Sequence, residues 1–397
     1  MKKILISSRA FLLILLLLST WSLTIVEGES EDTYYSLRSE ITYINPEDSG
    51  RIWNLTQDDY TISLFMNNSW QSVQLKTATH TLRTTQTDED GNSIGVLELP
   101  TSRLLPGENV SFTVEYHIDA KPRVLPYISE NGSQSLSMIP DSLVQLHTGS
   151  EGPWLTNNVA LMNLSHEIAG TETNVLRIVK KTVSWIKDNI DYVTHETPRY
   201  ANETYSSRVG DCDDQAILLI TLLRILRIPS FLQIGAIYIP QLVGENQSLW
   251  NDHVTVVQSK IGWHGWAEVY VPPWGWLPVD LTYVLQGFKD PLNAVLYGAV
   301  VEHNAVQYMN ISRFDYVADS LEAKDFILRN GFRIYSEDEM SETSANIGNS
   351  GSNTAVFDLV PIVVPIVAIV LLVLLLAVLY VHRQRRKAQT AETHLIR

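Results

Sequence analysis

The only cysteine of this 397-residue chain lies where a helix is expected to begin. Cys212 follows Asp211, a favourable N-cap residue, and precedes Asp214, whose carboxylate stands where a capping box requires one. Residues 216–226 continue as a mostly apolar run of helix-forming residues. The unpaired N–H groups and the dipole of a first helical turn favour a thiolate, while the neighbouring aspartates oppose it. A lone cysteine is more often a small buried side chain, but burial does not explain the acidic setting, so we interpret Cys212 as a nucleophile.

A histidine and an aspartate fall on two strands that are expected to form a hairpin. Residues 263–271 alternate in polarity, residues 272–275 are typical of a turn, and residues 276–282 return. With the centre of the turn near its first two residues, the numbers of paired residues add up to about 544 to 546. His264 then lies opposite Asp280, or one diagonal step away on the same face. A thiol, a histidine and a carboxylate that orients the histidine are the parts of a cysteine nucleophile system.

Other assignments of these residues stay open. His264 could be a hydrogen-bonded strand histidine, Asp280 could be a strand-end carboxylate, and His253 on the preceding strand is a rival general base. Cys212, His253, His264 and Asp280 are all chemically suitable zinc ligands, but none of them form a pair with the short spacing typical of a zinc site. We therefore predict no metal and no organic cofactor.

The surrounding elements follow an order typical of an α+β fold. Residues 154–168 and 174–190 have the apolar periodicity of helices. Residues 230–239 and 251–259 are rich in the β-branched and aromatic residues of strands. We expect the cysteine-bearing helix to pack on an antiparallel sheet that carries the histidine and the aspartate.

Four short motifs lie in this region. They are Gly-Asp-Cys at 210–212, Leu-Arg-x-x-x-Ile-Pro at 223–229, His-x-Trp-x-Glu-Val-Tyr-Val at 264–271 and Gly-Trp-x-Pro-Val-Asp-x-Thr at 275–282. Together they resemble the transglutaminase-like superfamily of papain-type thiol enzymes, over about residues 153–282. The resemblance implies a papain-like or transglutaminase-like core in which Cys212 is the nucleophile, His264 the general base and acid, and Asp280 the group that orients the histidine.

Two positions depart from the pattern of that family. Arg227 stands where the family usually has glycine, and Leu281 stands where proline is common. Both lie away from the reacting groups, so the three site residues remain intact. The resemblance further implies a membrane-anchored member of prokaryotic or archaeal type.

These residues predict a cell-surface thiol enzyme that transfers or hydrolyses acyl groups at peptide or glutamine amides through a Cys212 thioester. Its expected partner is an extracellular protein or peptide substrate. The alternative is a catalytically spent surface protein that uses the same domain for binding or as a scaffold. The formal net charge of −15 argues against nucleic acid as a partner.

The N-terminal part has the pattern of an export signal followed by a β-rich domain. Residues 1–28 are typical of a signal peptide because basic residues precede an apolar run, although the length of that run also fits an uncleaved signal anchor. Residues 29–122 have the alternation and turns of an all-β sandwich domain. Within it, residues 88–92 are expected to form a hairpin turn rather than a calcium loop, because Ser93 replaces the glycine that such a loop needs.

The rest of the chain divides by composition. We assign residues 123–152 to a connection, residues 153–335 to the catalytic domain and residues 336–357 to a flexible stalk. Residues 358–381 are long and apolar enough to cross a bilayer as a helix. The basic cluster in residues 382–397 places that tail in the cytoplasm. The predicted location is therefore the cell membrane, with a single span and the ectodomain outside.

Glycosylation sequons occur throughout the expected ectodomain and not in the tail. The Asn-x-Ser/Thr tripeptides begin at Asn54, Asn67, Asn109, Asn131, Asn163, Asn202, Asn246 and Asn310. Polar exported loops also collect such tripeptides by chance. The pattern nonetheless predicts a surface glycoprotein, in agreement with the expected topology.

Overall fold

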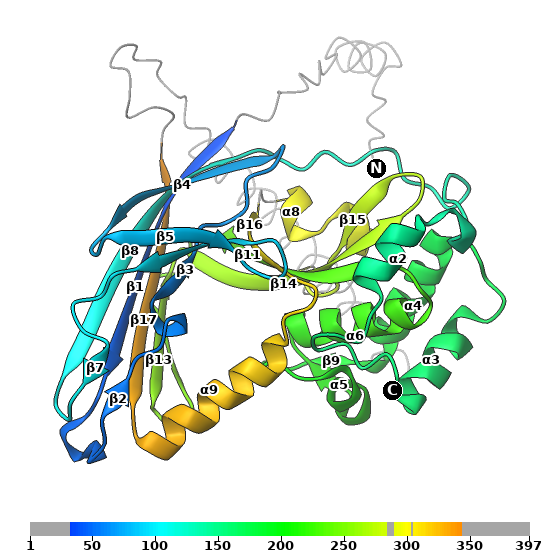
Figure 1. Ribbon diagram of the computed structural model, residues 1–397. Helices are drawn as coiled ribbons and strands as arrows, with labels where there is room; N and C mark the ends of the chain where they lie inside the picture. The colour runs from blue at the N-terminus through cyan, green and yellow to red at the C-terminus, as the bar shows by residue number, and fades with distance from the viewer. Residues whose placement is uncertain (1–31, 284–289, 303–304, 344–397) are drawn as a thin grey trace, which may run out of the picture. The chain divides into compact units, whose positions relative to one another are not determined.

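The computed structural model describes residues 32–283, 290–302 and 305–343 (Figure 1). They form a mixed structure of helices and strands, as the sequence predicts. The expected signal peptide, membrane span and cytoplasmic tail lie outside the described residues. Within the part of the chain that is described, no helix is both long and apolar enough to span a membrane.

A four-stranded antiparallel sheet contains the expected hairpin. Its order is β15 (Gly275–Val279), β14 (Ile261–Val271), β11 (Ser230–Tyr238) and β16 (Val306–Ile311). The strand β11 pairs with β14 on one side and with β16 on the other. Strands form here because β-branched and aromatic side chains fit a pleated surface that is covered on its faces.

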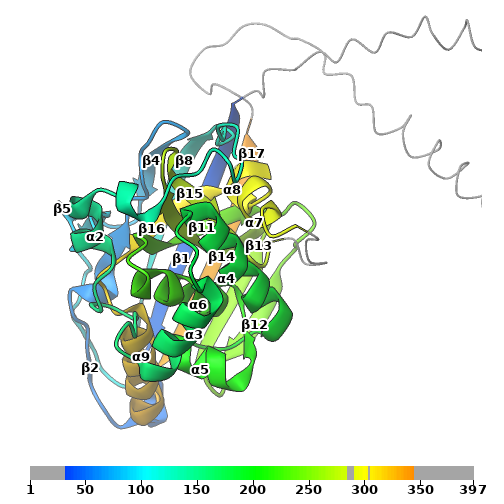
Figure 2. The ribbon, with the colours of Figure 1, turned by 90° about the vertical axis from the view of Figure 1, so that its right-hand side faces the viewer.

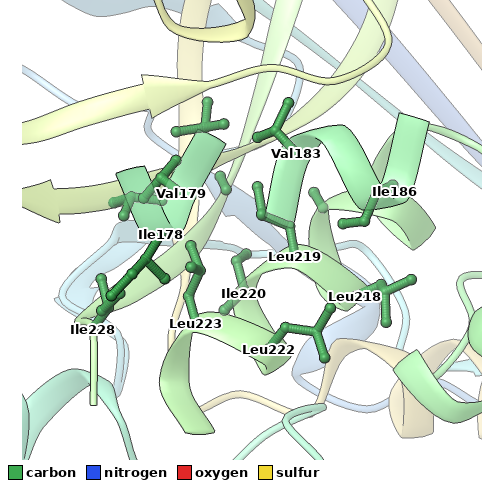
Figure 3. Close-up of a cluster of buried hydrophobic side chains, with 14 of the residues drawn as sticks. Ile178, Val179, Val183, Ile186, Leu218, Leu219, Ile220, Leu222, Leu223 and Ile228 are labelled. Carbon is green, nitrogen blue, oxygen red and sulfur yellow. The ribbon is translucent and has the colours of Figure 1, made fainter. Parts of the chain in front are cut away.

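Three helices cover one face of this sheet, namely α3 (Val159–Ala169), α4 (Val175–Asn189) and α6 (Cys212–Ile225). Figure 2 shows them in front of the strands. The side chains of α6 from residue 216 to residue 223 are all buried, and Figure 3 shows its Leu219 beside Val183 and Ile186 of α4. Each such aliphatic side chain stabilises the fold by about 1.5–3 kcal/mol when fully buried. This core holds the start of α6 in place.

The other elements are shorter or more peripheral. The helices are α2 (Asp141–His147), α5 (Ala201–Ser207), α7 (Asn293–Leu296), α8 (Ala299–Glu302) and α9 (Tyr316–Asn330). The small sheets consist of β2 (Trp53–Asn54) with β7 (Arg103–Leu104), β9 (Asp191–Tyr192) with β10 (Val209–Gly210), and β3 (Thr61–Ser63) with β6 (Ser93–Leu97) and β5 (Leu82–Thr87).

A six-stranded sheet combines strands from distant parts of the chain. Its order is β12 (Glu245–Leu249), β13 (Val254–Ser259), β17 (Arg333–Thr343), β1 (Thr33–Ile44), β8 (Asn109–Ala120) and β4 (Gln71–Ala78). The strand β1 pairs with β8 on one side and with β17 on the other, and β17 pairs in parallel with β13. The sheet thus joins segments that we assigned to a sandwich domain and to a catalytic domain, and the domain boundaries themselves stay a prediction.

The first part of the expected stalk is a strand instead. Residues 336–343 belong to β17, where Met340 is fully buried and Asp338 accepts a hydrogen bond of 2.6 Å from the hydroxyl of Ser39. The polar side chains of this segment are tolerated in a strand because solvent and the neighbouring strands provide their hydrogen-bond partners. For this reason its composition resembles that of a stalk. The remainder of the expected stalk, residues 344–357, lies outside the described residues.

A second hydrophobic core lies between the two large sheets. Leu37 and Phe112 of the six-stranded sheet pack in one cluster with Ala236 and Val306 of the four-stranded sheet. In Figure 1 the four-stranded sheet lies between the six-stranded sheet and the helices α4 and α6. The four-stranded sheet is therefore covered on both faces.

The turn at residues 88–92 agrees with the expected hairpin. The carboxylate of Asp88 accepts hydrogen bonds from the N–H groups of Asp90 and Asn92, at 2.9 and 2.8 Å. The carboxylate of Asp90 points away from this turn and accepts hydrogen bonds from the N–H groups of residues 312, 313 and 314. These hydrogen bonds hold the loop that leads into α9 against the turn.

Candidate active site

The hairpin places His264 one diagonal step from Asp280. Ala267 faces Val279 and Val271 faces Gly275, which is the higher of the two registers that we expected. Asp280 is the residue that follows β15, and the Nε2 atom of His264 lies 2.9 and 3.0 Å from its two carboxylate oxygens. The structure thus brings the predicted histidine and carboxylate into direct contact.

The backbone holds the carboxylate of Asp280 in a fixed orientation. It accepts hydrogen bonds from the N–H groups of Thr282, Tyr283 and Ala299, at 3.3, 3.1 and 3.0 Å. Asp280 is only 1% exposed. A carboxylate with this many fixed donors has little freedom to rotate away from His264.

Cys212 is the first residue of α6 and is partly exposed. The short pairing of β9 with β10 leads the chain into this helix, with Gly210 opposite Tyr192. Gly210 is required there, because a Cβ atom would lie 2.8 Å from the Cβ of Asp214 and 2.9 Å from Cγ2 of Thr204. The tight approach sets the position of the thiol at the start of the helix.

The charge state of His264 depends on both of its neighbours. Burial alone would lower the pKa of its imidazole, but the charge of Asp280, the hydrogen bond to Asp280, and the hydrogen bond and charge of Cys212 raise that pKa to about 10. At neutral pH the ring therefore carries two protons. An imidazolium in contact with a cysteine is the arrangement that stabilises a thiolate.

Three aspartates crowd the start of α6. Burial, together with the hydrogen bond and charge of Asp211, raises the pKa of Asp213 well above its ordinary value, and the hydroxyl of Tyr316 donates to it at 3.1 Å. Burial and the charge of Asp211 raise the pKa of Asp214 to about 7. One oxygen from each of these carboxylates lies within 4.8 Å of the others, so they could hold a cation with a preference for oxygen ligands. Alternatively, two of the three carboxyl groups stay protonated, which also relieves the repulsion between the negative charges.

The structure gives less support to His253 as the general base and to a zinc site. His253 lies just before β13, where its Nδ1 atom is 2.6 Å from the carbonyl oxygen of Phe332. Within the described residues the aspartate cluster is the one grouping of three or more metal-ligating atoms, so Cys212, His253, His264 and Asp280 do not gather as a zinc set. Our prediction that the protein uses no metal stays a prediction.

Residues 162–281 match the family model described as the transglutaminase-like superfamily. We call these residues the transglutaminase-like domain after this similarity. The match begins within α3, includes α4, α6 and the hairpin of β14 and β15, and ends one residue after Asp280.

Solved structures provide further similarities at low identity. A protein from Cytophaga hutchinsonii, described as a "Putative Cysteine Protease", has a TM-score of 0.47 and 17% identity, covering 83% of this chain and 95% of its own. LapG of Legionella pneumophila has a TM-score of 0.26 and 16% identity, covering 52% of this chain and 98% of its own. Among curated proteins, no match was found.

Sequence reasoning missed a buried ion pair beside the histidine of the transglutaminase-like domain. Both carboxylate oxygens of Glu268 accept hydrogen bonds from Arg123, which also donates to the carbonyl of Trp276 at 2.9 Å. The indole N–H of Trp266 donates to Glu268 at 3.2 Å, and its ring lies 6.0 Å from that of His264 in a stacked orientation. A glutamate between apolar residues of a strand was the available signal, because a buried carboxylate requires a partner.

A cavity of about 870 Å³ opens beside His264. Tyr192 and Tyr283 line it next to the histidine, while Tyr35 of β1 and Glu342 of β17 line it from the six-stranded sheet. Its volume lies in the range of ligand-binding pockets. The transglutaminase-like domain therefore shares this groove with the sheet that packs on it.

Proposed function

We propose that the protein is a cell-surface thiol enzyme that transfers or hydrolyses acyl groups at peptide or glutamine amides. The observation that supports this most is the contact of one imidazole, that of His264, with both Asp280 and Cys212. The match of residues 162–281 to the transglutaminase-like superfamily supports the same chemistry. A cysteine, a histidine and an orienting carboxylate are sufficient for covalent acyl transfer.

In the proposed reaction His264 begins as an imidazolium beside the Cys212 thiolate. The sulfur attacks the amide carbonyl carbon, a C–S bond forms, and the carbonyl electrons move to the oxygen. When the C–N bond breaks, the departing amine takes the proton from His264 and a thioester remains. Water or a second amine then attacks the carbonyl carbon of the thioester and gives its proton to the neutral imidazole. The C–S bond breaks and the Cys212 thiolate leaves, which restores the thiolate–imidazolium pair. Water yields an acid, and an amine yields a new amide.

Two parts of the fold assist this chemistry. Asp280 faces His264 through the whole cycle and stabilises the imidazolium by its charge. The backbone N–H of Cys212 lies in the first turn of α6, where N–H groups have no partner within the helix, so it is available to the developing oxyanion.

The proposed location outside the cell rests on the sequence at the two ends of the chain. A signal peptide over residues 1–28 and one membrane span over residues 358–381, followed by a basic tail, would leave the transglutaminase-like domain on the outer surface. Seven of the eight sequon asparagines are exposed, which supports N-glycosylation at those positions. Asn310 is the exception, because it pairs with Gln233 inside the four-stranded sheet.

The proposal is tested by labelling the thiol. Cys212 is the only cysteine, so the rate of alkylation by iodoacetamide reports on this residue alone. We expect the full-length protein at pH 6 to react at least about tenfold faster than the variant His264→Ala, because the imidazolium that stabilises the thiolate is lost. The matched variant His253→Ala removes the rival base and should react at the wild-type rate.

Equal and slow alkylation of wild type and His264→Ala would contradict the proposed thiolate–imidazolium pair. The thiol would then have no activating partner, and a binding or scaffold role would become the better account of the domain. A loss of rate in His253→Ala instead would identify that residue as the partner.

A further inference from the structure

The groove beside His264 is formed by two separate parts of the fold. One wall comes from the transglutaminase-like domain, with Tyr238 at the end of β11 and Trp263 preceding His264 on β14. The other wall comes from the six-stranded sheet, with Tyr35 of β1 and Glu342 of β17. His264, which contacts Cys212, is part of the lining, so the groove leads from the thiol's partner toward the six-stranded sheet.

Aromatic faces dominate the lining of the groove. The rings of Tyr35 and Tyr238 lie 5.3 Å apart in a tilted arrangement. The indole N–H of Trp263 is already donated to Asp338 at 2.9 Å, so this residue offers mainly its ring. Among the described residues that line the groove, none is a lysine or an arginine. The groove therefore presents π faces and no permanent positive charge of its own apart from His264.

Glu342 supplies the carboxylate of this lining. It lies directly opposite Tyr35 in the antiparallel pairing of β1 with β17, so the two side chains share a face. The same face of β17 carries the buried residues Met340 and Asp338, and the opposite face carries the exposed Glu339. Glu342 itself is exposed, and no ion pair joins it to a cation within the described part of the chain.

The charge of Glu342 acts inside the groove. Burial and then this charge raise the pKa of Tyr35 to about 12. Aromatic faces beside a carboxylate attract a cation through the ring quadrupoles and the negative charge together. The net charge of −15 over the chain favours the approach of cationic partners in the same direction.

We propose that this groove is the subsite for a lysine or arginine side chain of a polypeptide substrate, with Glu342 as the counter-charge and Tyr35 and Tyr238 as aromatic walls. The proposal rests on the proposed function in one respect, since it places the reacting acyl group of the same polypeptide at Cys212. Substrates with a negative side chain at this position are disfavoured, because Glu342 repels them.

The test measures binding without chemistry. The full-length variant Cys212→Ala is mixed with capped hexapeptides in which one position carries lysine, arginine, norleucine or glutamate and the other positions are randomised. We expect peptides with lysine or arginine at one position to bind at least about tenfold more tightly than those with norleucine, which has a similar shape without the charge, and glutamate to bind most weakly. Introducing Glu342→Gln should abolish the preference for the cation over norleucine.

Glu339→Gln is the matched control, because it removes the same charge from the opposite face of the same strand and should leave the preference intact. Equal binding of lysine and norleucine peptides, a preference that survives Glu342→Gln, or no binding by any peptide would overturn the proposal. Slow alkylation of Cys212 together with a preference for cations would disprove the enzyme function and leave the subsite. Fast alkylation without a preference for cations would support the enzyme function and disprove the subsite.

Discussion

Asp280 contributes more than any other residue to the charge state of the candidate site. Its carboxylate is held by backbone N–H groups on one side and contacts His264 on the other. Burial of the imidazole opposes protonation, yet the pKa of His264 is raised, because the charge and hydrogen bond of Asp280 together with those of Cys212 outweigh burial. A small change at this one carboxylate should therefore have a large effect on the histidine.

The variant Asp280→Asn tests this balance. Removing the negative charge leaves burial as the dominant influence, so the pKa of His264 should fall from its raised value of about 10. In wild type the imidazolium should persist through neutral pH and be lost only as the pH rises through about 10. In the variant we expect titration at least about one pH unit lower. Nitrogen-detected NMR of the histidine ring measures both, with His264→Gln to assign the signal.

A His264 signal that titrates at the same pH in wild type and in Asp280→Asn would show that the carboxylate does not control the imidazole. The variant Asp290→Asn is a suitable control, because Asp290 is an exposed carboxylate bound to Lys180 rather than to the histidine.

At the scale of elements, the two faces of β14 make different contacts. Ala267, Val269 and Val271 belong to the core that includes α4 and α6. At the alternate positions, Trp266 and Glu268 bind each other, and Glu268 also binds Arg123. Arg123 belongs to the segment that we assigned to a connection, and its guanidinium also lies over the ring of Trp70, 4.7 Å from the centroid. The connection is therefore fastened to the strand that carries the histidine.

The variant Arg123→Met should be strongly destabilising. It leaves the carboxylate of Glu268 buried without its partner, and breaking a buried pair in this way typically costs about 3–5 kcal/mol. The double variant Arg123→Met with Glu268→Met removes both charges and should recover much of that loss. Chemical denaturation followed by tryptophan fluorescence measures the free energy of unfolding.

Arg38→Met provides the control for that experiment, because it breaks a partly exposed pair with Glu40. Such surface pairs typically contribute about 0–1 kcal/mol. If Arg123→Met proved no more destabilising than Arg38→Met, the buried pair would have no special role in the fold.

At the scale of the whole molecule, the first and last described strands are neighbours. β1 pairs along its length with β17, and the contact between Ser39 and Asp338 joins positions 299 residues apart. This pairing also places Tyr35 and Glu342 in the groove beside His264. The site is therefore completed by strands that lie outside the transglutaminase-like match at residues 162–281.

Truncation tests the importance of this pairing. A chain that ends at residue 332 lacks β17 and leaves β1 and β13 without the strand that lies between them. We expect that chain to lose cooperative thermal unfolding, because the buried Met340 and a full row of ladder hydrogen bonds are missing. A chain that ends at residue 345 retains β17 and should unfold at the temperature of the full-length protein. Cooperative unfolding of the shorter chain would show that β17 is dispensable.

The parts of the site that depend on residues close together in the chain could be predicted from the sequence alone. Cys212 at a helix start followed from the capping residues and the apolar run behind it. The closeness of His264 and Asp280 followed from the alternation and turn of a single hairpin, although the sequence left both the opposite and the diagonal register open. Both patterns are local, because helix capping and hairpin register are set by residues within a few positions of one another.

The contacts that join this site to the rest of the molecule depend on the complete fold. Glu268 binds Arg123, which lies 145 positions earlier in the sequence. The strand β17 pairs with β1 although its polar composition resembles that of a linker. A buried carboxylate signals that a partner exists but not which one, and a strand with a polar composition gains its stability from the strands beside it. The groove that Tyr35 and Glu342 share with His264 exists only once those distant pairings have formed.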